Sequence, residues 1–252
     1  MDKNLIYIGG STSAIQFCGR SLREHGFPII NESHPDVKHL LLDVPSFGPE
    51  GQLRMGGSID ALLSQFSEDI TIYGGNLKHP TLAHYRTVDF LEDPWYLSEN
   101  AYITAECALD VALPYLTITL RSCPVLIIGW GRIGKCLARL LHSMGASVSV
   151  AARKETDRAM IQALGMAALD IRSIPHAISQ FRLIYNTVPS LVLTAAEMAP
   201  CRDDCICIDL ASAKGIEQEN VITARGLPGI HLPESSGNLI AKTFLRHYLK
   251  EV

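Results

Sequence analysis

The sequence predicts an α/β protein of two domains, each built on a parallel sheet. Three observations predict this fold class. Short apolar runs alternate with helical patterns along most of the chain, a glycine-rich turn joins one such run to a helix in the second half, and 252 residues exceed the usual length of one domain. Hydrophobic residues make up 47% of the chain and charged residues 19%, so a sizeable core is expected.

The first 100 residues predict a small α/β domain. Strands are expected at residues 5–8, 40–43 and 70–73, and helices at residues 13–25 and 58–66. Strands that alternate with amphipathic helices indicate a parallel sheet covered by helices, and we therefore expect a flavodoxin-like domain. Its Gly9-Gly10 turn lacks the further spaced glycines that a nucleotide-binding fingerprint requires.

A connecting helix is expected from Asn100 to about Leu113, where Pro114 ends it. Residues 237–249 have an apolar face at helical spacing, and we expect this terminal helix to pack on the first domain. The predicted substrate or catalytic domain is therefore residues 1–100 completed by residues 237–252, and the second domain is residues 101–236.

The second half contains the most informative motif, where an apolar strand at residues 125–128 leads into a GxGxxG turn and a helix. Gly129 permits the tight turn, Gly131 lets the backbone approach a diphosphate, and Gly134 lets the helix pack closely on the strand. This setting predicts a Rossmann-type doubly wound sheet that binds a dinucleotide. The predicted contacts are Gly129, Trp130, Gly131, Arg132, Ile133 and Gly134.

The strand expected at residues 147–152 ends in Arg153-Lys154. An NAD-binding domain usually has a carboxylate here that accepts hydrogen bonds from the ribose, whereas an arginine followed by a lysine suits a 2′-phosphate. We therefore predict NADP as the cofactor, with NAD as the alternative. A solvated basic loop is the other interpretation of Arg153 and Lys154.

Two later strands, at residues 183–186 and 206–210, should also end near the cofactor, because open parallel sheets bind ligands at the carboxyl ends of their strands. A further strand is expected near residues 221–224. Asn-Thr-Val-Pro is also a good turn sequence, so residues 186–189 have a purely structural interpretation as well. The predicted contacts are Asn186, Thr187, Val188, Pro189, Asp209 and Ala211.

Catalytic candidates are Thr104 and Glu106 at the expected start of the connecting helix. Glu106 would serve as a general acid or base if burial moved its pKa toward neutrality, and it would otherwise only complement the helix dipole after an Asn100 cap. Ser235 and Ser236 lie in a loop at residues 226–237 that we expect to close a site. His231 has no adjacent carboxylate apart from Glu234, and no histidine–carboxylate dyad is evident.

The seven cysteines are interpreted as structural thiols in a reducing compartment, and no metal is predicted. Four are scattered among apolar neighbours: Cys18, Cys107, Cys123 and Cys136. The spacing of Cys201, Cys205 and Cys207 does not match a usual zinc site, and no histidine is nearby.

The formal net charge of −4 gives no reason to expect a nucleic acid or an anionic membrane as a partner. No apolar run approaches the ~20 residues of a membrane-spanning helix, and the first residues do not have the pattern of a signal peptide. The sequence therefore predicts a cytoplasmic protein.

Taken in order, several of these segments resemble the A subunits of dipicolinate synthases. They are residues 100–106, 129–134, 152–153, 186–190, 209–212 and 226–229. The resemblance implies a two-domain protein with a Rossmann-type nucleotide domain, related in plan to 2-hydroxyacid dehydrogenases. Together with Arg153 and Lys154, it predicts an NADP-dependent oxidoreductase. It also implies a role in sporulation, a dihydrodipicolinate-type cyclic dicarboxylate substrate and a flavoprotein-like B subunit. Because two-domain dehydrogenases often pair through the nucleotide domain, we also expect a homodimer.

The chain departs from the pattern of this family at Cys107, at residues 213–216 and at Glu234, where the family has lysine. A carboxylate near a dianionic substrate repels it, so these departures weaken the substrate assignment more than the cofactor assignment. The alternatives are a related dehydrogenase of another small keto or imino acid, and a non-catalytic NAD(P)-binding sensor or scaffold subunit.

Overall fold

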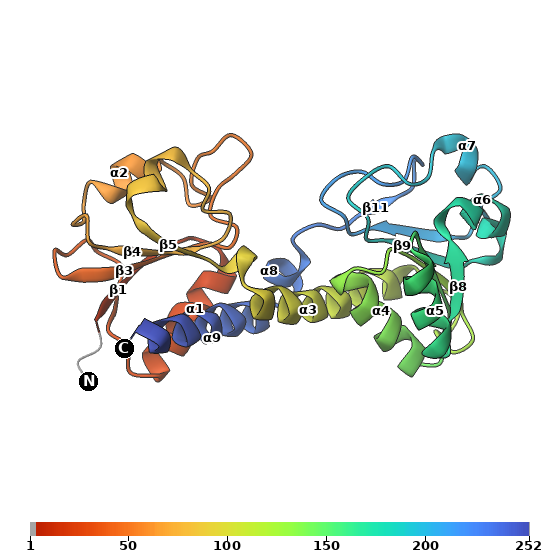
Figure 1. The fold of residues 1–252 in the computed structure, drawn as a ribbon, viewed down its shortest axis with the longest axis horizontal. Coiled ribbons are helices and arrows are strands. Elements are labelled where there is room, and N and C mark those ends of the chain that lie inside the picture. Colours follow the sequence, from red (N-terminus) through yellow and green to blue (C-terminus); the bar gives the residue numbers. More distant parts are fainter. Residues whose placement is uncertain (1–3, 252) are drawn as a thin grey trace. The chain divides into compact units, whose positions relative to one another are not determined.

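The computed structural model describes residues 4–251. The chain divides into two compact units: unit 1 extends to Asn100 and resumes at Pro228, and unit 2 is Ala101–Leu227. Each unit contains one parallel sheet, so the α/β fold class is confirmed (Figure 1). None of the helices formed by the described residues has the length and apolar character needed to cross a membrane.

Unit 1 contains a five-stranded sheet in the order β2-β1-β3-β4-β5, and every neighbouring pair is parallel. This is the flavodoxin-like order expected for the first domain. Two edge strands were not predicted, because β2 has only two residues and β5 is largely exposed. The strands are β1 (Leu5–Gly9), β2 (Ile29–Ile30), β3 (Val37–Leu42), β4 (Thr71–Gly74) and β5 (Arg86–Asp89).

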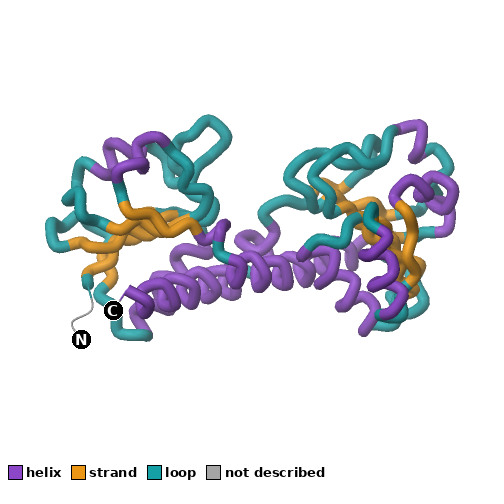
Figure 2. Tube along the Cα trace, viewed as in Figure 1, coloured by secondary structure: helices purple, strands orange, loops and turns teal. Residues whose placement is uncertain are grey.

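Helices cover both faces of this sheet (Figure 2). On one face α1 (Ser13–Glu24) and α9 (Pro233–Glu251) lie side by side, and a Cβ on Gly237 would stand 2.4 Å from the Ala14 carbonyl oxygen. Glycine therefore permits this close approach. On the other face Ile59, Leu62 and Leu63 of α2 (Ile59–Leu63) join the core formed by β3 and β4.

The connecting helix α3 (Pro94–Ala112) begins six residues before the predicted start. Asp93 caps it, because its Oδ1 accepts hydrogen bonds from the N–H groups of Trp95 at 2.8 Å and Tyr96 at 3.1 Å. The predicted Asn100 cap is therefore wrong, since this residue lies inside the helix. The Asp-Pro pair at residues 93–94 was the sequence signal for the true start.

Asp93 also joins α3 to α9 within unit 1. Its Oδ2 contacts His247 Nε2 at 2.7 Å and forms an ion pair with Arg246, and its side chain is only 6% exposed. Burial raises the pKa of Asp93, but donors from Tyr96, His247, Arg246 and Trp95 outweigh burial and hold this pKa at about 2. The folded state therefore favours the ionised carboxylate.

We expect Asp93→Asn to lower the free energy of unfolding by on the order of 2 kcal/mol at pH 7. A depressed carboxyl pKa stabilises the fold fully above the unfolded value of about 3.9, and this contribution disappears as the pH falls to about 2. The difference in the free energy of unfolding between the original chain and Asp93→Asn should therefore disappear over this pH range, as measured by denaturant titrations. Glu99→Gln removes an exposed pair with Lys242 and should change stability by less than about 0.5 kcal/mol. A difference that persists unchanged near pH 2 would refute the ionic role.

Unit 2 contains a six-stranded sheet in the order β11-β10-β9-β6-β7-β8, again with parallel pairs. Numbered within the unit, this order is 6-5-4-1-2-3, which is the Rossmann-type doubly wound order. The strand order reverses between β6 and β9, so this junction is the topological switch point. The strands are β6 (Pro124–Ile128), β7 (Ser147–Ala152), β8 (Ala167–Asp170), β9 (Leu183–Asn186), β10 (Ile206–Asp209) and β11 (Ile222–Thr223).

Helices pack along this second sheet and fix the strand ends that form the site. The Tyr185 hydroxyl donates a hydrogen bond to the Ala108 carbonyl at 3.1 Å, which attaches the second half of α3 to β9. Residues of α6 and α7 pack with Leu126 and Ile184 in a common core. The helices are α4 (Arg132–Ser143), α5 (Glu155–Ala163), α6 (Ile174–Ala177) and α7 (Ala195–Met198). The short helix α8 (Leu227–His231) begins at the last residue of unit 2 and otherwise belongs to unit 1.

Two predicted features near the C-terminus need correction. Helix α9 begins at Pro233, not at residue 237, because this proline occupies its first position and the Ser236 N–H bonds to the Leu232 carbonyl at 3.0 Å. The predicted loop at residues 226–237 instead contains α8 and the first turn of α9. Ser235 and Ser236 are therefore helical.

Candidate functional site

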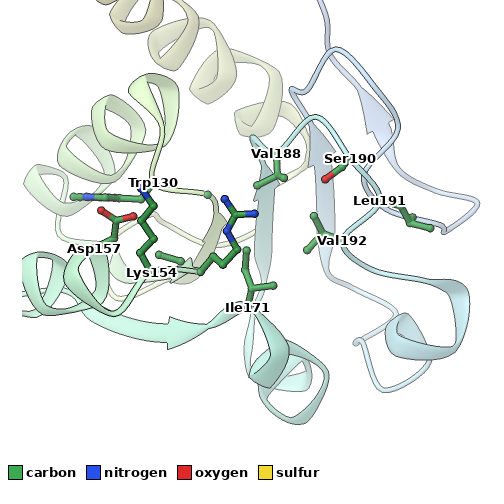
Figure 3. Close-up of a pocket in the computed structure, with 11 residues that line it drawn as sticks. Trp130, Lys154, Asp157, Ile171, Val188, Ser190, Leu191 and Val192 are labelled. Atoms are coloured by element: carbon green, nitrogen blue, oxygen red, sulfur yellow. The ribbon is translucent and has the colours of Figure 1, made fainter.

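A cavity of about 390 Å³ opens at the carboxyl ends of β6, β7 and β9 (Figure 3). It lies at the switch point of the unit 2 sheet, where open parallel sheets bind their ligands. Its lining residues are Gly129, Trp130, Ala152, Arg153, Lys154, Asp157, Ile171, Val188, Ser190, Leu191 and Val192.

Two glycines of the fingerprint are required by the fold of the turn itself. Gly129 has φ +105°, and a Cβ there would lie 2.5 Å from Thr187 Oγ1. A Cβ on Gly134 would lie 2.2 Å from the Gly129 carbonyl oxygen. A side chain on Gly134 would push α4 away from the end of β6, and a side chain on Gly129 would displace Thr187 and Val188 after β9.

Gly131 differs from the other two, because a Cβ there would have no protein atom within 4 Å. It is the N-cap of α4, with φ −78° and ψ −171°, and it provides no side chain to bond the first-turn N–H groups. These donors and the positive end of the helix dipole suit an anion. The open space beside Gly131 therefore fits the diphosphate of a dinucleotide.

The end of the cavity that follows β7 is positively charged. Arg153 and Lys154 follow β7, are exposed, and have no ion-pair partner among the residues that the structure describes. Asp157 also lines the cavity, so these three side chains together carry one net positive charge. Figure 3 shows Trp130, Lys154 and Asp157 grouped on one side of the cavity.

Arg158 holds the turn that presents these cations, although sequence analysis did not identify it. Its Nη1 donates to the carbonyls of Ala152 and Arg153, at 2.9 Å each, and forms an ion pair with Asp170 at 3.0 Å. Hydrogen bonds from Arg172, together with the charge of Arg158, hold the pKa of Asp170 well below its usual range. Arg158 is therefore a positioning residue for this turn, and it does not itself line the cavity.

Asn186 and Asp209, both predicted to contact the cofactor, are instead buried and bonded to each other. Asn186 Nδ2 donates to Asp209 Oδ1 at 2.8 Å and to the Val188 carbonyl at 3.0 Å. Asp209 also accepts from the N–H groups of Ala211 at 3.1 Å and Gly215 at 2.7 Å. Both side chains therefore fix the loops after β9 and β10, and neither lines the cavity.

The remaining predicted cofactor residues divide between the cavity wall and its support. Thr187 Oγ1 donates to the Ile128 carbonyl at 2.9 Å and so links the turns after β9 and β6. Val188 lines the cavity, whereas Pro189 does not, and Ala211 is buried. The neighbouring Ser190 lines the cavity although it was not predicted.

None of the four catalytic candidates lines this cavity. Glu106 lies in the middle of α3 and is exposed, so the burial on which its predicted acid–base role depended is absent. Thr104 is buried in the same helix. Ser235 is exposed and Ser236 is buried in the first turn of α9, which belongs to unit 1.

Residues 103–225 match the model of the NAD binding domain of D-isomer specific 2-hydroxyacid dehydrogenases. The chain is also 27% identical over 150 residues to the A subunit of dipicolinate synthase from Bacillus subtilis (strain 168). This chain resembles dipicolinate synthase A subunits. The match covers 56% of this chain and about half, 50%, of that protein.

Two solved structures of dipicolinate synthase A subunits have the same fold. The protein from Bacillus halodurans superposes with a TM-score of 0.83 at 22% identity, covering 97% of each chain. The protein from Bacillus subtilis gives a TM-score of 0.82 at 21% identity, covering 99% of this chain and 97% of that one. The expected resemblance is confirmed, and unit 2 contains a domain for a nicotinamide dinucleotide of the kind found in dehydrogenases. The chain is thus similar to NAD(P)-binding oxidoreductases, and the match to the NAD binding domain lies in unit 2.

Proposed function

We propose that this chain is an NADP-dependent oxidoreductase of the dipicolinate synthase A type, acting on a dihydrodipicolinate-type cyclic dicarboxylate. The observation that supports the choice of NADP is the end of β7. Arg153 and Lys154 line the cavity there without ion-pair partners among the described residues, at the place where NAD-binding domains have a ribose-binding carboxylate.

The residues of unit 2 suit each part of NADP. The N–H groups that begin α4 would hold the diphosphate, and the open space at Gly131 admits it. Arg153 and Lys154 would bind the 2′-phosphate through charge-assisted hydrogen bonds. The apolar side chains of Ile171 and Val192 offer surface for a purine ring. When bound, the nicotinamide supplies hydride transfer to or from a ring carbon of the substrate.

We also propose substrate contacts within unit 2. Thr104 and Ser212 would hydrogen-bond a substrate carboxylate, and because Glu106 is exposed, water is a simpler proton carrier than this side chain. Glu234 is exposed in the first turn of α9, and its charge disfavours a dianion nearby. As partners we also propose a flavoprotein-like B subunit, and a second copy of this chain in a homodimer.

Arg153→Asp is expected to weaken NADPH binding by on the order of 10- to 100-fold, because it replaces a phosphate-binding cation with a repelling carboxylate. NADH lacks the 2′-phosphate, so its affinity should stay within about threefold or improve. Isothermal titration calorimetry with both reduced nucleotides measures this change.

The matched control is Arg139→Asp, which makes the same charge change on an exposed position of α4 outside the cavity. This variant should leave both affinities within about twofold of the original, since Arg139 does not line the cavity and salt screens the interactions of exposed charges. Unchanged NADPH affinity in Arg153→Asp, or an equal loss in both variants, would exclude the phosphate role.

Substrate assignment requires an activity measurement. NADPH absorbance should change with cyclic imino dicarboxylates, either with this chain alone or after addition of a flavoprotein-like B subunit. Turnover that occurs only when the B subunit is present would identify this chain as one component of a larger enzyme. Tight NADPH binding without turnover in either sample would reject the enzymatic proposal and leave the cofactor assignment intact.

A further inference from the structure

Three cysteine thiols of unit 2 lie close together near the start of β10. The Sγ atoms of Cys201, Cys205 and Cys207 all lie within 4.8 Å of one another. Cys207 is buried in β10, whereas Cys201 and Cys205 are half-buried in the loop that precedes this strand. The spacing of the cysteines along the chain suggested separate structural thiols, but the loop folds back and places all three sulfurs together.

The loop that brings these thiols together is held by contacts that involve no sulfur. The Cys205 N–H donates to the Arg202 carbonyl at 3.1 Å. Arg202 Nε pairs with Asp204 Oδ1 at 2.7 Å, and Arg182 pairs with Asp204 Oδ2 at 2.8 Å. All three cysteines are free thiols. The convergence therefore does not depend on a disulfide.

We propose that Cys201, Cys205 and Cys207 bind one thiophilic metal ion of the zinc class. Metal–sulfur bonds of about 2.3 Å place tetrahedral ligand sulfurs roughly 3.8 Å apart, so the cluster needs a contraction of at most about 1 Å. A ligand set of sulfur alone selects Zn²⁺ or another soft ion over Mg²⁺ or Ca²⁺. The group contains no fourth cysteine, histidine or carboxylate among the described residues, which leaves one coordination position for water.

The position of the site indicates what the ion does. Cys207 lies two residues before Asp209, whose carboxylate fixes the loops after β9 and β10. An ion shared by these thiols joins the preceding loop to β10 and stabilises the folded unit, because the unfolded chain has no preformed site. This inference is independent of the proposed catalytic function.

Titration of the reduced, metal-free full chain with Cd²⁺ tests the site through the ultraviolet charge-transfer absorption of cadmium–thiolate bonds. The absorption should saturate at one ion per chain, a large excess of Zn²⁺ should reduce it by competition, and Zn²⁺ should raise the melting temperature of the metal-free chain. Cys201→Ser and Cys205→Ser should each weaken binding by on the order of tenfold or more. Cys136→Ser is the matched control, because it removes a half-buried thiol outside the group and should bind as the original chain does.

Circular dichroism of each metal-free variant shows whether it is folded, and the titration of the unmodified chain does not depend on the variants. Three results would overturn the proposal. The first is that the folded, reduced chain shows no saturable absorption. The second is that the Cys201→Ser, Cys205→Ser double variant absorbs as strongly as the original chain. The third is that a chain that binds no Cd²⁺ when reduced loses two thiols to a disulfide in air.

Discussion

Gly131→Val is expected to abolish dinucleotide binding without unfolding the protein. A Cβ at this position meets no protein atom within 4 Å, and its backbone angles are open to any residue, so the free energy of unfolding should change by about 1 kcal/mol or less. The added methyl groups would occupy the space required by the diphosphate. We expect affinity for NADPH and NADH to fall at least about 100-fold in calorimetric titrations, as both share this group.

Gly134→Ala provides the contrast, because its Cβ would overlap the Gly129 carbonyl oxygen at 2.2 Å. This variant should lose about 1–3 kcal/mol of stability and bind nucleotide weakly as a consequence of a displaced α4. Thermal melting of both variants separates the two effects. Retained nucleotide affinity in a folded Gly131→Val protein would place the diphosphate elsewhere.

Asp209→Ala is expected to cause the largest loss of stability, about 3 kcal/mol or more, because it leaves three buried donors without their acceptor. These are the Asn186 amide and the N–H groups of Ala211 and Gly215. The loops after β9 and β10 should loosen, so affinity for the dinucleotide should fall together with stability. Denaturant unfolding and calorimetry on the same sample measure both effects.

Asp203→Ala is the control for this variant, since Asp203 is an exposed carboxylate in the loop before β10 with no ion pair among the described residues. It should change the free energy of unfolding by about 0.5 kcal/mol or less. If Asp209→Ala were no less stable than this control, the Asn186–Asp209 pair would not support the two loops.

Much of the fold follows from local sequence. The glycine-rich turn after residues 125–128 predicted the Rossmann-type sheet, because this spacing of glycines is typical of the turn that joins the first strand of that fold to its helix. The edge strands β2, β5 and β8 escaped prediction because each is short and at most partly buried, so hydrophobic alternation is weak. The start of α3 was missed because the apolar pattern begins later than the Asp-Pro cap that starts the helix.

The candidate site was predictable where backbone chemistry determines it and not where tertiary packing does. Motif spacing singled out Gly129 and Arg153, which line the cavity, and Gly131, which is the N-cap of α4. The roles of Asn186 and Asp209 could not, because a polar residue at a strand end bonds a ligand or a neighbouring strand with equal local preference. Only their burial, and the 2.8 Å hydrogen bond between them, shows that each side chain meets the hydrogen-bonding requirement of the other.

Calorimetric titration of the folded chain with NADPH and NADH shows whether the unit 2 cavity binds a dinucleotide. We expect saturable binding of one nucleotide per chain, with NADPH bound more tightly than NADH and the preference removed by Arg153→Asp. Absence of heat with either nucleotide, from a chain shown to be folded, would contradict this expectation.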